Sequence, residues 1–140
     1  MPRLFGRLLI VLAALTLVAT ACGGGDSADL EAQTWTMTGI GGRVALPSAV
    51  STLTFAADGS LNGNTGCNSF STTYEVDGDR MTIDPQIAAT LQACEPAVND
   101  QEAAVFAALG DTTKYSIDGN DLRLLDDADT VLARYSADAG

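Results

Sequence analysis

The chain of 140 residues is predicted to be a mainly β protein with one helix, folded as a single domain. The first observation is a set of three Asp-Gly pairs, Asp58-Gly59, Asp77-Gly78 and Asp118-Gly119, each between two runs of alternating apolar and polar residues. Such pairs form the tight turns of β-hairpins. The second is the share of hydrophobic residues, 46%, which is too high for a disordered chain. The third is a single stretch with helical spacing.

The strands are predicted from apolar residues that recur at every second position, which places them on one face of a strand. In one such run Phe70, Thr72, Tyr74 and Val76 share a face. The predicted strands are 35–40, 51–55, 60–64, 70–76, 80–83, 114–117, 121–125 and 131–135.

The helix is predicted between the fifth and sixth of these strands. Asn99 and Asp100 suit the cap at its start, and Gly110 suits its C-terminal end. Its apolar residues recur at helical spacing, so we expect the helix to lie on or plug a small barrel. The simplest interpretation of this stripe is core packing, and the alternative is a partner surface. The stripe consists of Val98, Val105, Phe106 and Leu109.

The first 21 residues are predicted to be an export signal. Arg3 and Arg7 precede an apolar run, 8–18, which is too short to span a bilayer and has the length of a signal-peptide core. Small residues at 19–21 then lead to Cys22. This order resembles a bacterial lipobox, whose cysteine is lipidated, although alanine stands where leucine is usual. The alternative is an ordinary cleaved signal followed by an incidental cysteine.

We expect the mature protein to be extracytoplasmic and anchored to the bacterial cell membrane through the lipid at Cys22. Residues 22–32 are predicted to be a flexible, solvated tether, and the domain is expected over 33–137. Loss of Arg3 and Arg7 leaves five basic against 18 acidic residues, a balance of −13. A body with this charge repels nucleic acid.

Cys67 and Cys94 remain as a pair once Cys22 is assigned to lipidation. In an oxidising compartment they can form a disulfide worth about 3.5 kcal/mol, or they can stay buried free thiols. Two thiolates make a poor zinc site. The chain has no histidine and thus lacks the commonest general base. We expect no catalytic residue, metal or cofactor.

The segment Gly66-Cys67-Asn68, followed by Phe70 and Tyr74, resembles the signature of the META domain, or HslJ-like, family. Further residues agree with the family pattern in order, although Gln92 stands where methionine is common. The agreeing residues include Trp35, Thr90, Ala93, Cys94, Glu102 and Phe106.

The resemblance implies a small antiparallel, lipocalin-like β-barrel of about eight strands, and a disulfide between Cys67 and Cys94. Members of the family have been associated with heat-shock response, novobiocin resistance, and secretion or motility. We interpret the signature as structural. Gly66 allows a close approach, and Asn68 can hydrogen-bond to the backbone of a turn. The alternative is a ligand contact.

The function expected from these features is that of a non-catalytic, lipid-anchored envelope protein. It would serve envelope maintenance or stress tolerance by binding an unidentified protein or small ligand. One alternative is an inhibitor of a basic extracellular hydrolase, either a lysozyme or a protease, since an acidic surface suits a basic enzyme. The other is a lipocalin-like carrier of a small ligand.

Overall fold

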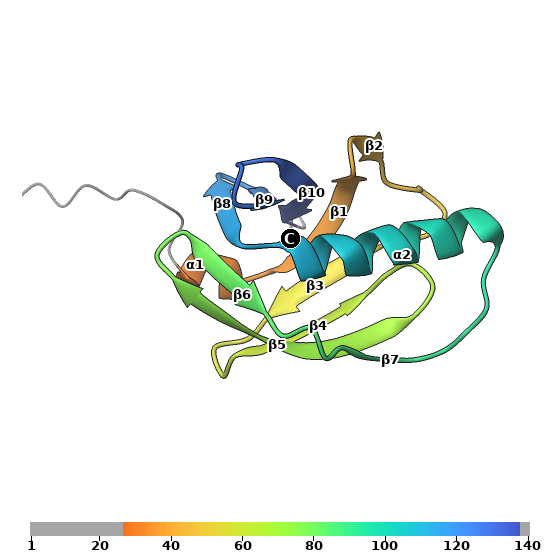
Figure 1. The fold of residues 1–140 in the computed structure, drawn as a ribbon, viewed down its shortest axis with the longest axis horizontal. Helices are drawn as coiled ribbons and strands as arrows, with labels where there is room; N and C mark the ends of the chain where they lie inside the picture. The colour runs from red at the N-terminus through yellow and green to blue at the C-terminus, as the bar shows by residue number, and fades with distance from the viewer. Residues whose placement is uncertain (1–26, 138–140) are drawn as a thin grey trace, which may run out of the picture.

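A computed structural model describes residues 27–137 (Figure 1). Ten strands and two helices make up this part of the chain. The predicted signal, the lipidation site at Cys22 and the first half of the predicted tether lie outside the described residues. The strands are β1 (Thr34–Ile40), β2 (Arg43–Val44), β3 (Thr52–Phe55), β4 (Ser60–Asn64), β5 (Ser69–Asp77), β6 (Arg80–Ile83), β7 (Ala88–Ala89), β8 (Lys114–Asp118), β9 (Asp121–Leu125) and β10 (Val131–Ala137), and the helices are α1 (Ser27–Glu31) and α2 (Pro96–Asp111).

Eight of the strands form a closed antiparallel barrel, as predicted. Each pairs with its neighbours in chain order, β1-β3-β4-β5-β6-β8-β9-β10, and β10 pairs with β1 to close the barrel. All eight predicted strands are therefore confirmed, within one or two residues at their ends. The two short strands β2 and β7 were not predicted. They pair with the ends of β1 and β5 and have too few residues to show an alternation.

The barrel has two ends of different construction, because antiparallel strands place their connections alternately at one end and the other. The hairpin end carries α1 and the three Asp-Gly turns. The loop end carries the β1–β2 hairpin and the connections 45–51, 65–68, 84–95 and 126–130. Helix α2 joins β6 to β8 and lies along the barrel in Figure 1.

The interior of the barrel is one apolar cluster. Alternate residues of every barrel strand point inward, as in β5, where Phe70 and Tyr74 are buried. The largest of the fully buried side chains fill the interior from several strands. They include Trp35, Phe55, Leu53, Leu61, Met81, Leu122, Leu124 and Tyr135.

Helix α1 corrects the expected tether. We expected residues 22–32 to be solvated throughout, but Ser27–Glu31 is helical and Leu30 is fully buried. The indole Nε1 of Trp35 donates a hydrogen bond of 2.9 Å to the backbone oxygen of Leu30. Burial of one leucine beside the tryptophan brings this segment into the domain, which the polar composition of the segment does not reveal.

Helix α2 begins and ends outside the predicted limits. It starts at Pro96, and the residue before it, Glu95, makes no side-chain cap. Proline suits a first helical position because the N–H it lacks has no partner there. The helix passes Gly110 and ends at Asp111. Of the predicted stripe, Val105 and Leu109 are buried in the core, together with Gln101 and Ala108.

Candidate functional site

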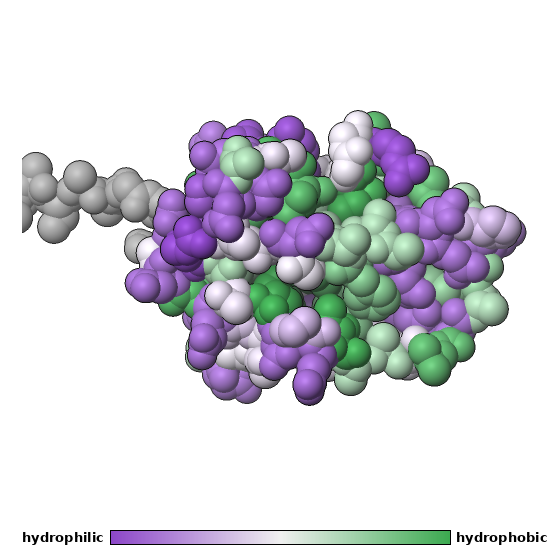
Figure 2. Space-filling view, viewed as in Figure 1, coloured by the Kyte–Doolittle hydropathy of each residue, from purple (hydrophilic) through white to green (hydrophobic). Residues whose placement is uncertain are grey.

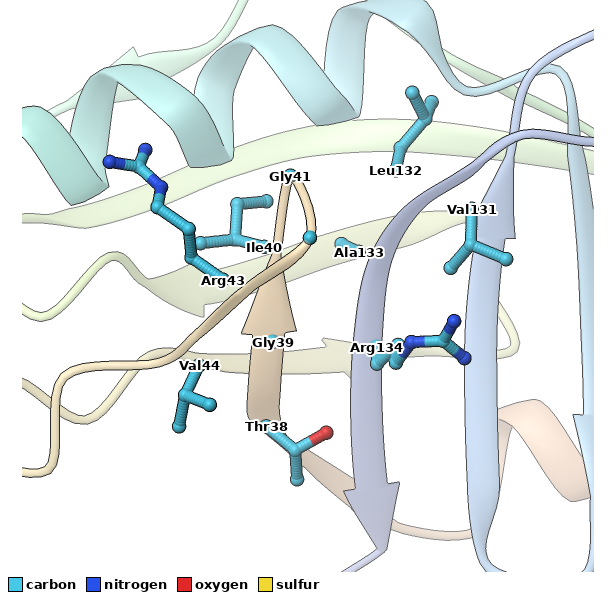
Figure 3. A pocket seen from close by; sticks show the side chains of 11 residues that line it. Thr38, Gly39, Ile40, Gly41, Arg43, Val44, Val131, Leu132, Ala133 and Arg134 are labelled. Atoms are coloured by element: carbon cyan, nitrogen blue, oxygen red, sulfur yellow. The ribbon is translucent and has the colours of Figure 1, made fainter.

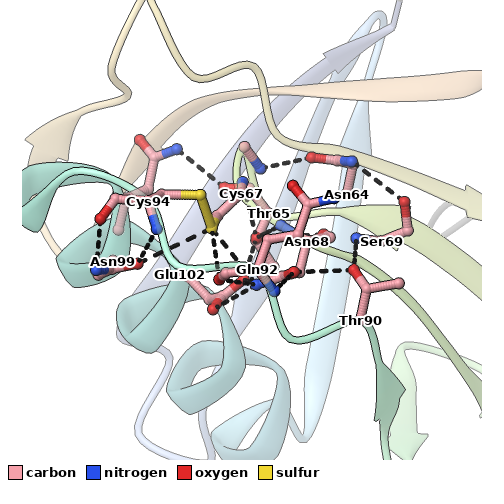
Figure 4. Close-up of a disulfide and its surroundings, with 12 residues drawn as sticks. Asn64, Thr65, Cys67, Asn68, Ser69, Thr90, Gln92, Cys94, Asn99 and Glu102 are labelled. Carbon is pink, nitrogen blue, oxygen red and sulfur yellow. Dashed lines mark hydrogen bonds between the residues drawn. A yellow bond between two sulfur atoms is a disulfide. The ribbon is translucent and has the colours of Figure 1, made fainter.

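The loop end is held together by a set of side chains that we call the loop clamp: Thr65, Asn68, Gln101, Glu102 and the disulfide between Cys67 and Cys94. Figure 4 shows most of these residues converging between α2 and the connection that precedes it. Two adjacent residues of α2, Gln101 and Glu102, supply its centre because the second turn of the helix lies over the loops.

Gln101 joins two of the long connections. Its side chain is 5% exposed, and its Oε1 accepts a hydrogen bond of 2.9 Å from the N–H of Leu46. Its Nε2 donates to the backbone oxygens of Ala49 at 2.8 Å and Thr65 at 3.1 Å. A buried glutamine that satisfies three backbone groups fixes the loops to the helix, since each group would be costly to leave unpaired.

Glu102 orients the asparagine of the family signature. Its carboxylate accepts hydrogen bonds from Thr65 Oγ1 at 2.6 Å and from Asn68 Nδ2 at 2.9 Å. Hydrogen bonds to an ionised group are stronger than neutral ones. The amide of Asn68, which is 3% exposed, is therefore held in one orientation.

Asn68 uses the rest of its amide to hold the connection before α2. Its Oδ1 accepts hydrogen bonds from Thr90 Oγ1 at 2.9 Å and from the N–H of Gln92 at 2.7 Å. Its Nδ2 also donates to the backbone oxygen of Gln92 at 3.2 Å. Both neighbours of Leu91 are thus fastened to one buried side chain.

Cys67 and Cys94 form a disulfide with a Cα–Cα distance of 6.0 Å. Asn99 supports it: its Nδ2 donates to the backbone oxygen of Cys94 at 2.9 Å, and its Oδ1 accepts from the N–H of Cys94 at 3.2 Å. Asn99 was predicted to cap α2, but it lies inside the first turn and hydrogen-bonds to the loop instead.

Gly66 allows two loops to touch. Its φ is +97°, and a Cβ atom built on it would lie 2.6 Å from the backbone oxygen of Ala49. Only glycine meets both the conformation and the lack of space without strain. The close approach expected at this position is therefore present in the structure.

The other two signature residues lie apart from the loop clamp. Phe70 packs edge-on against Phe106 of α2, with ring centroids 5.6 Å apart. Tyr74 packs edge-on against Phe55 near the hairpin end, and its hydroxyl lies 3.0 Å from Glu31 Oε1 and 2.8 Å from the backbone oxygen of Ala56. Burial, and then Glu31, raise the pKa of Tyr74. Both residues serve the core.

Two hollows lie at the surface of the part of the chain that the structure describes. One, of about 280 Å³, lies beside the β1–β2 hairpin (Figure 3), where Arg43 and Arg134 point away from each other on either side of Gly39. Another, of about 650 Å³, lies over β5 and β6 and includes Glu75 and Asp84.

Charge on the surface remains strongly negative. Arg80 pairs with Asp127 at 3.0 Å and Lys114 with Asp129 at 2.9 Å, and these contacts lower the pKa of Asp127 and raise that of Lys114. In Figure 2 hydrophilic residues dominate the hairpin turns, whereas apolar residues gather along the middle of the face.

Within residues 27–137, two further features are absent, a cluster of metal-ligating side chains and a membrane-spanning helix. No three His, Cys, Asp or Glu side chains there come together as metal ligands. No helix there has both the length and the apolar character needed to cross a bilayer. In the acidic segment after β9, Asp126 accepts hydrogen bonds from the N–H groups of Ala128 and Thr130 at 2.9 Å.

The sequence pattern indicates the signature residues but not the other residues of the loop clamp. Glu102 and Thr90 were noted only as matches to the family pattern, and Gln92 only as a departure from it. Gln101 was not singled out, because nothing in a single sequence distinguishes a buried helical glutamine from a solvated one. Leu91 was not singled out either, since only the structure shows its exposure.

Comparisons with solved structures support the fold. A protein from Burkholderia xenovorans, solved by NMR, has a TM-score of 0.66 at 17% identity, with 100% of each chain covered. The crystal structure of a DUF4847 family protein from Bacteroides vulgatus has a TM-score of 0.63 at 15% identity, covering 79% of this chain and 96% of that one.

No curated protein sequence matches the chain significantly. The family model of the META domain matches residues 28–139, and the chain therefore belongs to the META domain family.

Proposed function

We propose that the protein is a non-catalytic, lipid-anchored envelope protein, held at the outer face of a bacterial membrane through Cys22. In this proposal it serves envelope maintenance or stress tolerance by binding another protein through its loop end. The loop clamp carries the proposal, because it holds exposed loops rigid and so lowers the entropy lost on binding.

The construction of the barrel supports the loop end as the binding surface. Chain segment 27–31 enters at the hairpin end, so a tether attached there leaves the loop end facing away from the membrane. β1, seven residues long, separates the two ends by roughly 20 Å. A partner in the space outside the membrane would therefore meet the loop end first.

A carrier function has less support. The interior is filled by large apolar side chains, and an eight-stranded barrel has room for such side chains or for one small ligand. Three buried hydroxyls among the described residues have no hydrogen-bond partner, those of Ser51, Thr113 and Tyr135, and of these only Tyr135 belongs to the apolar core cluster. One hydroxyl among packed apolar groups is a poor basis for binding a ligand.

Inhibition of a basic extracellular hydrolase is a second candidate, favoured by the acidic hollow over β5 and β6. Asp58, Glu75 and Asp84 line this hollow, and no basic residue lies among the groups that form it. A field of this sign accelerates association with a basic enzyme, and salt weakens the effect.

The experiment that tests the proposal is site-specific cross-linking in envelopes of the host. A photo-reactive residue replaces Ala93 at the loop end or, as a matched control, Asn120 at the hairpin end. We expect a discrete protein cross-link from position 93 and none from position 120. Equal products from both positions, or none from position 93, would contradict binding through the loop end.

The anchor is tested separately by Cys22→Ser. Loss of the acyl chains removes most of the membrane affinity of an exported protein, so we expect the variant to move to the soluble fraction after cell lysis. Retention of the variant in washed membranes, at the level of the unsubstituted protein, would contradict lipidation at this position.

A further inference from the structure

Leu91 is an apolar side chain almost completely surrounded by solvent. It is 96% exposed, more than the other two exposed large apolar residues, Val44 and Val50. It lies within a run of four exposed residues, Thr90-Leu91-Gln92-Ala93. A single exposed leucine is ordinary on a protein surface, and the support around this one is what sets it apart.

The main chain on both sides of Leu91 is fastened, whereas Leu91 itself is free. Thr90 is fixed by a hydrogen bond of 3.0 Å from its N–H to the backbone oxygen of Ser69, and Gln92 by its N–H and C=O contacts with Asn68. Within residues 27–137, the N–H and C=O of Leu91 make no hydrogen bond. A rigid frame therefore presents one side chain and its own peptide groups to solvent.

This arrangement fits the cleft of an endopeptidase. Such a cleft takes one side chain into a specificity pocket, and in serine proteases the carbonyl of the same residue enters the oxyanion hole. Leu91 supplies both groups from one exposed position. A partner that used the side chain alone would not require its peptide groups to be free.

We infer that Leu91 is the anchor of a protease-inhibiting loop, and that its partner is a secreted serine endopeptidase whose pocket accepts a large apolar side chain. The inference rests on the proposed function, protein binding through the loop end, and specifies the partner. The acidic body of the domain favours an enzyme with a basic surface.

The loop clamp also explains why a protease would cleave and release this loop only slowly. Hydrolysis of the Leu91–Gln92 bond adds one water and leaves a carboxylate on Leu91 and an amine on Gln92. Asn68 would still hold both Thr90 and Gln92, and the disulfide would still tie Cys94 to Cys67. The two new ends would stay together, so the enzyme would release them slowly and the bond could form again with loss of the same water.

The test is inhibition of three purified serine proteases by the full protein extracted from host membranes in detergent. Chymotrypsin and subtilisin take large apolar residues, and trypsin takes lysine and arginine. We expect inhibition of chymotrypsin or subtilisin, and a loss of about 30-fold or more in affinity on Leu91→Ala. Leu91→Lys moves the inhibition to trypsin. Val50→Ala, an exposed apolar residue outside the run, leaves it unchanged.

The opposite results overturn the inference. Rapid cleavage at Leu91–Gln92 with no inhibition makes the loop a substrate, and equal inhibition by the Leu91→Ala protein places the contact elsewhere. No inhibition of either apolar-specific enzyme also rejects it. If cross-linking from position 93 still captures a protein in that case, the proposed function stands and only the protease partner is wrong.

Discussion

The two ends of the barrel are built by different interactions. At the hairpin end, tight turns connect adjacent strands, and α1 seals the barrel with Leu30 against Trp35. At the loop end, three long connections are held by side-chain hydrogen bonds from α2 and by one disulfide. One end is closed by apolar packing, and the other is shaped by polar contacts that keep its loops exposed yet fixed.

The two ends therefore differ in what their interactions do. Those at the hairpin end mainly stabilise the fold, and those at the loop end mainly hold the exposed loops in position. Apolar packing contributes in proportion to the area it buries, and it requires no special loop shape. Directional hydrogen bonds to loop backbone groups contribute less energy each but determine where the loop lies. Changes at the hairpin end should therefore lower the stability of the domain most, and changes at the clamp should in addition loosen the loops.

The largest effect is expected from Trp35→Ala at the hairpin end. The indole is fully buried, and removing it leaves a large cavity, for which we expect a loss of about 3–5 kcal/mol in the free energy of unfolding. Denaturant unfolding measures this loss. A change below about 1 kcal/mol would show that the hairpin end does not limit stability.

The next effect is expected from the double change Cys67→Ser and Cys94→Ser. Opening a loop of 27 residues should cost about 3.5 kcal/mol through the greater entropy of the unfolded chain. Thermal unfolding without reductant measures it, and reductant should lower the melting temperature of the unsubstituted protein to a similar value. A melting temperature that reductant does not change would contradict a structural disulfide.

Asn68→Ala should cost about 2–3 kcal/mol, because it removes the acceptor of the Gln92 N–H and one of the two side chains that donate to Glu102. Its more specific effect is on the run after Thr90, which becomes accessible to broad-specificity proteases while the barrel stays folded. Limited proteolysis with mass spectrometry detects the new cleavage. Asn62→Ala, at an exposed position of β4, is the control and should show neither effect.

The smallest effect is expected from Asp127→Asn on the surface. Since Arg80 lowers the pKa of Asp127 in the folded protein, the ionised form stabilises the fold above the ordinary aspartate pKa of about 3.9. This contribution disappears as the pH falls through the lowered value. The melting temperatures of the two proteins should differ slightly at pH 7 and coincide near pH 2, and salt should reduce the difference. A difference that grew on acidification would contradict the ion pair.

The same division explains how much could be predicted from the sequence. The strands and hairpin turns follow local patterns, so β4, β6 and β9 were predicted to the residue. The disulfide followed from the family resemblance. Contacts between residues far apart in the chain were missed, among them Gln101 with Leu46 and Asn68 with Gln92. Each depends on which loop lies beside which, and no local pattern encodes that.

The clamp holds an exposed loop rigid, and amide hydrogen exchange followed by NMR tests this rigidity most directly. The N–H of Gln92 donates to Asn68 Oδ1 although the residue is exposed. We predict that this amide exchanges nearly as slowly as that of Phe70 in β5, whereas the amide of Leu91 exchanges at the rate of an open chain. If Gln92 exchanged as fast as Leu91, the loop would be mobile, and the clamp could not present it to a partner.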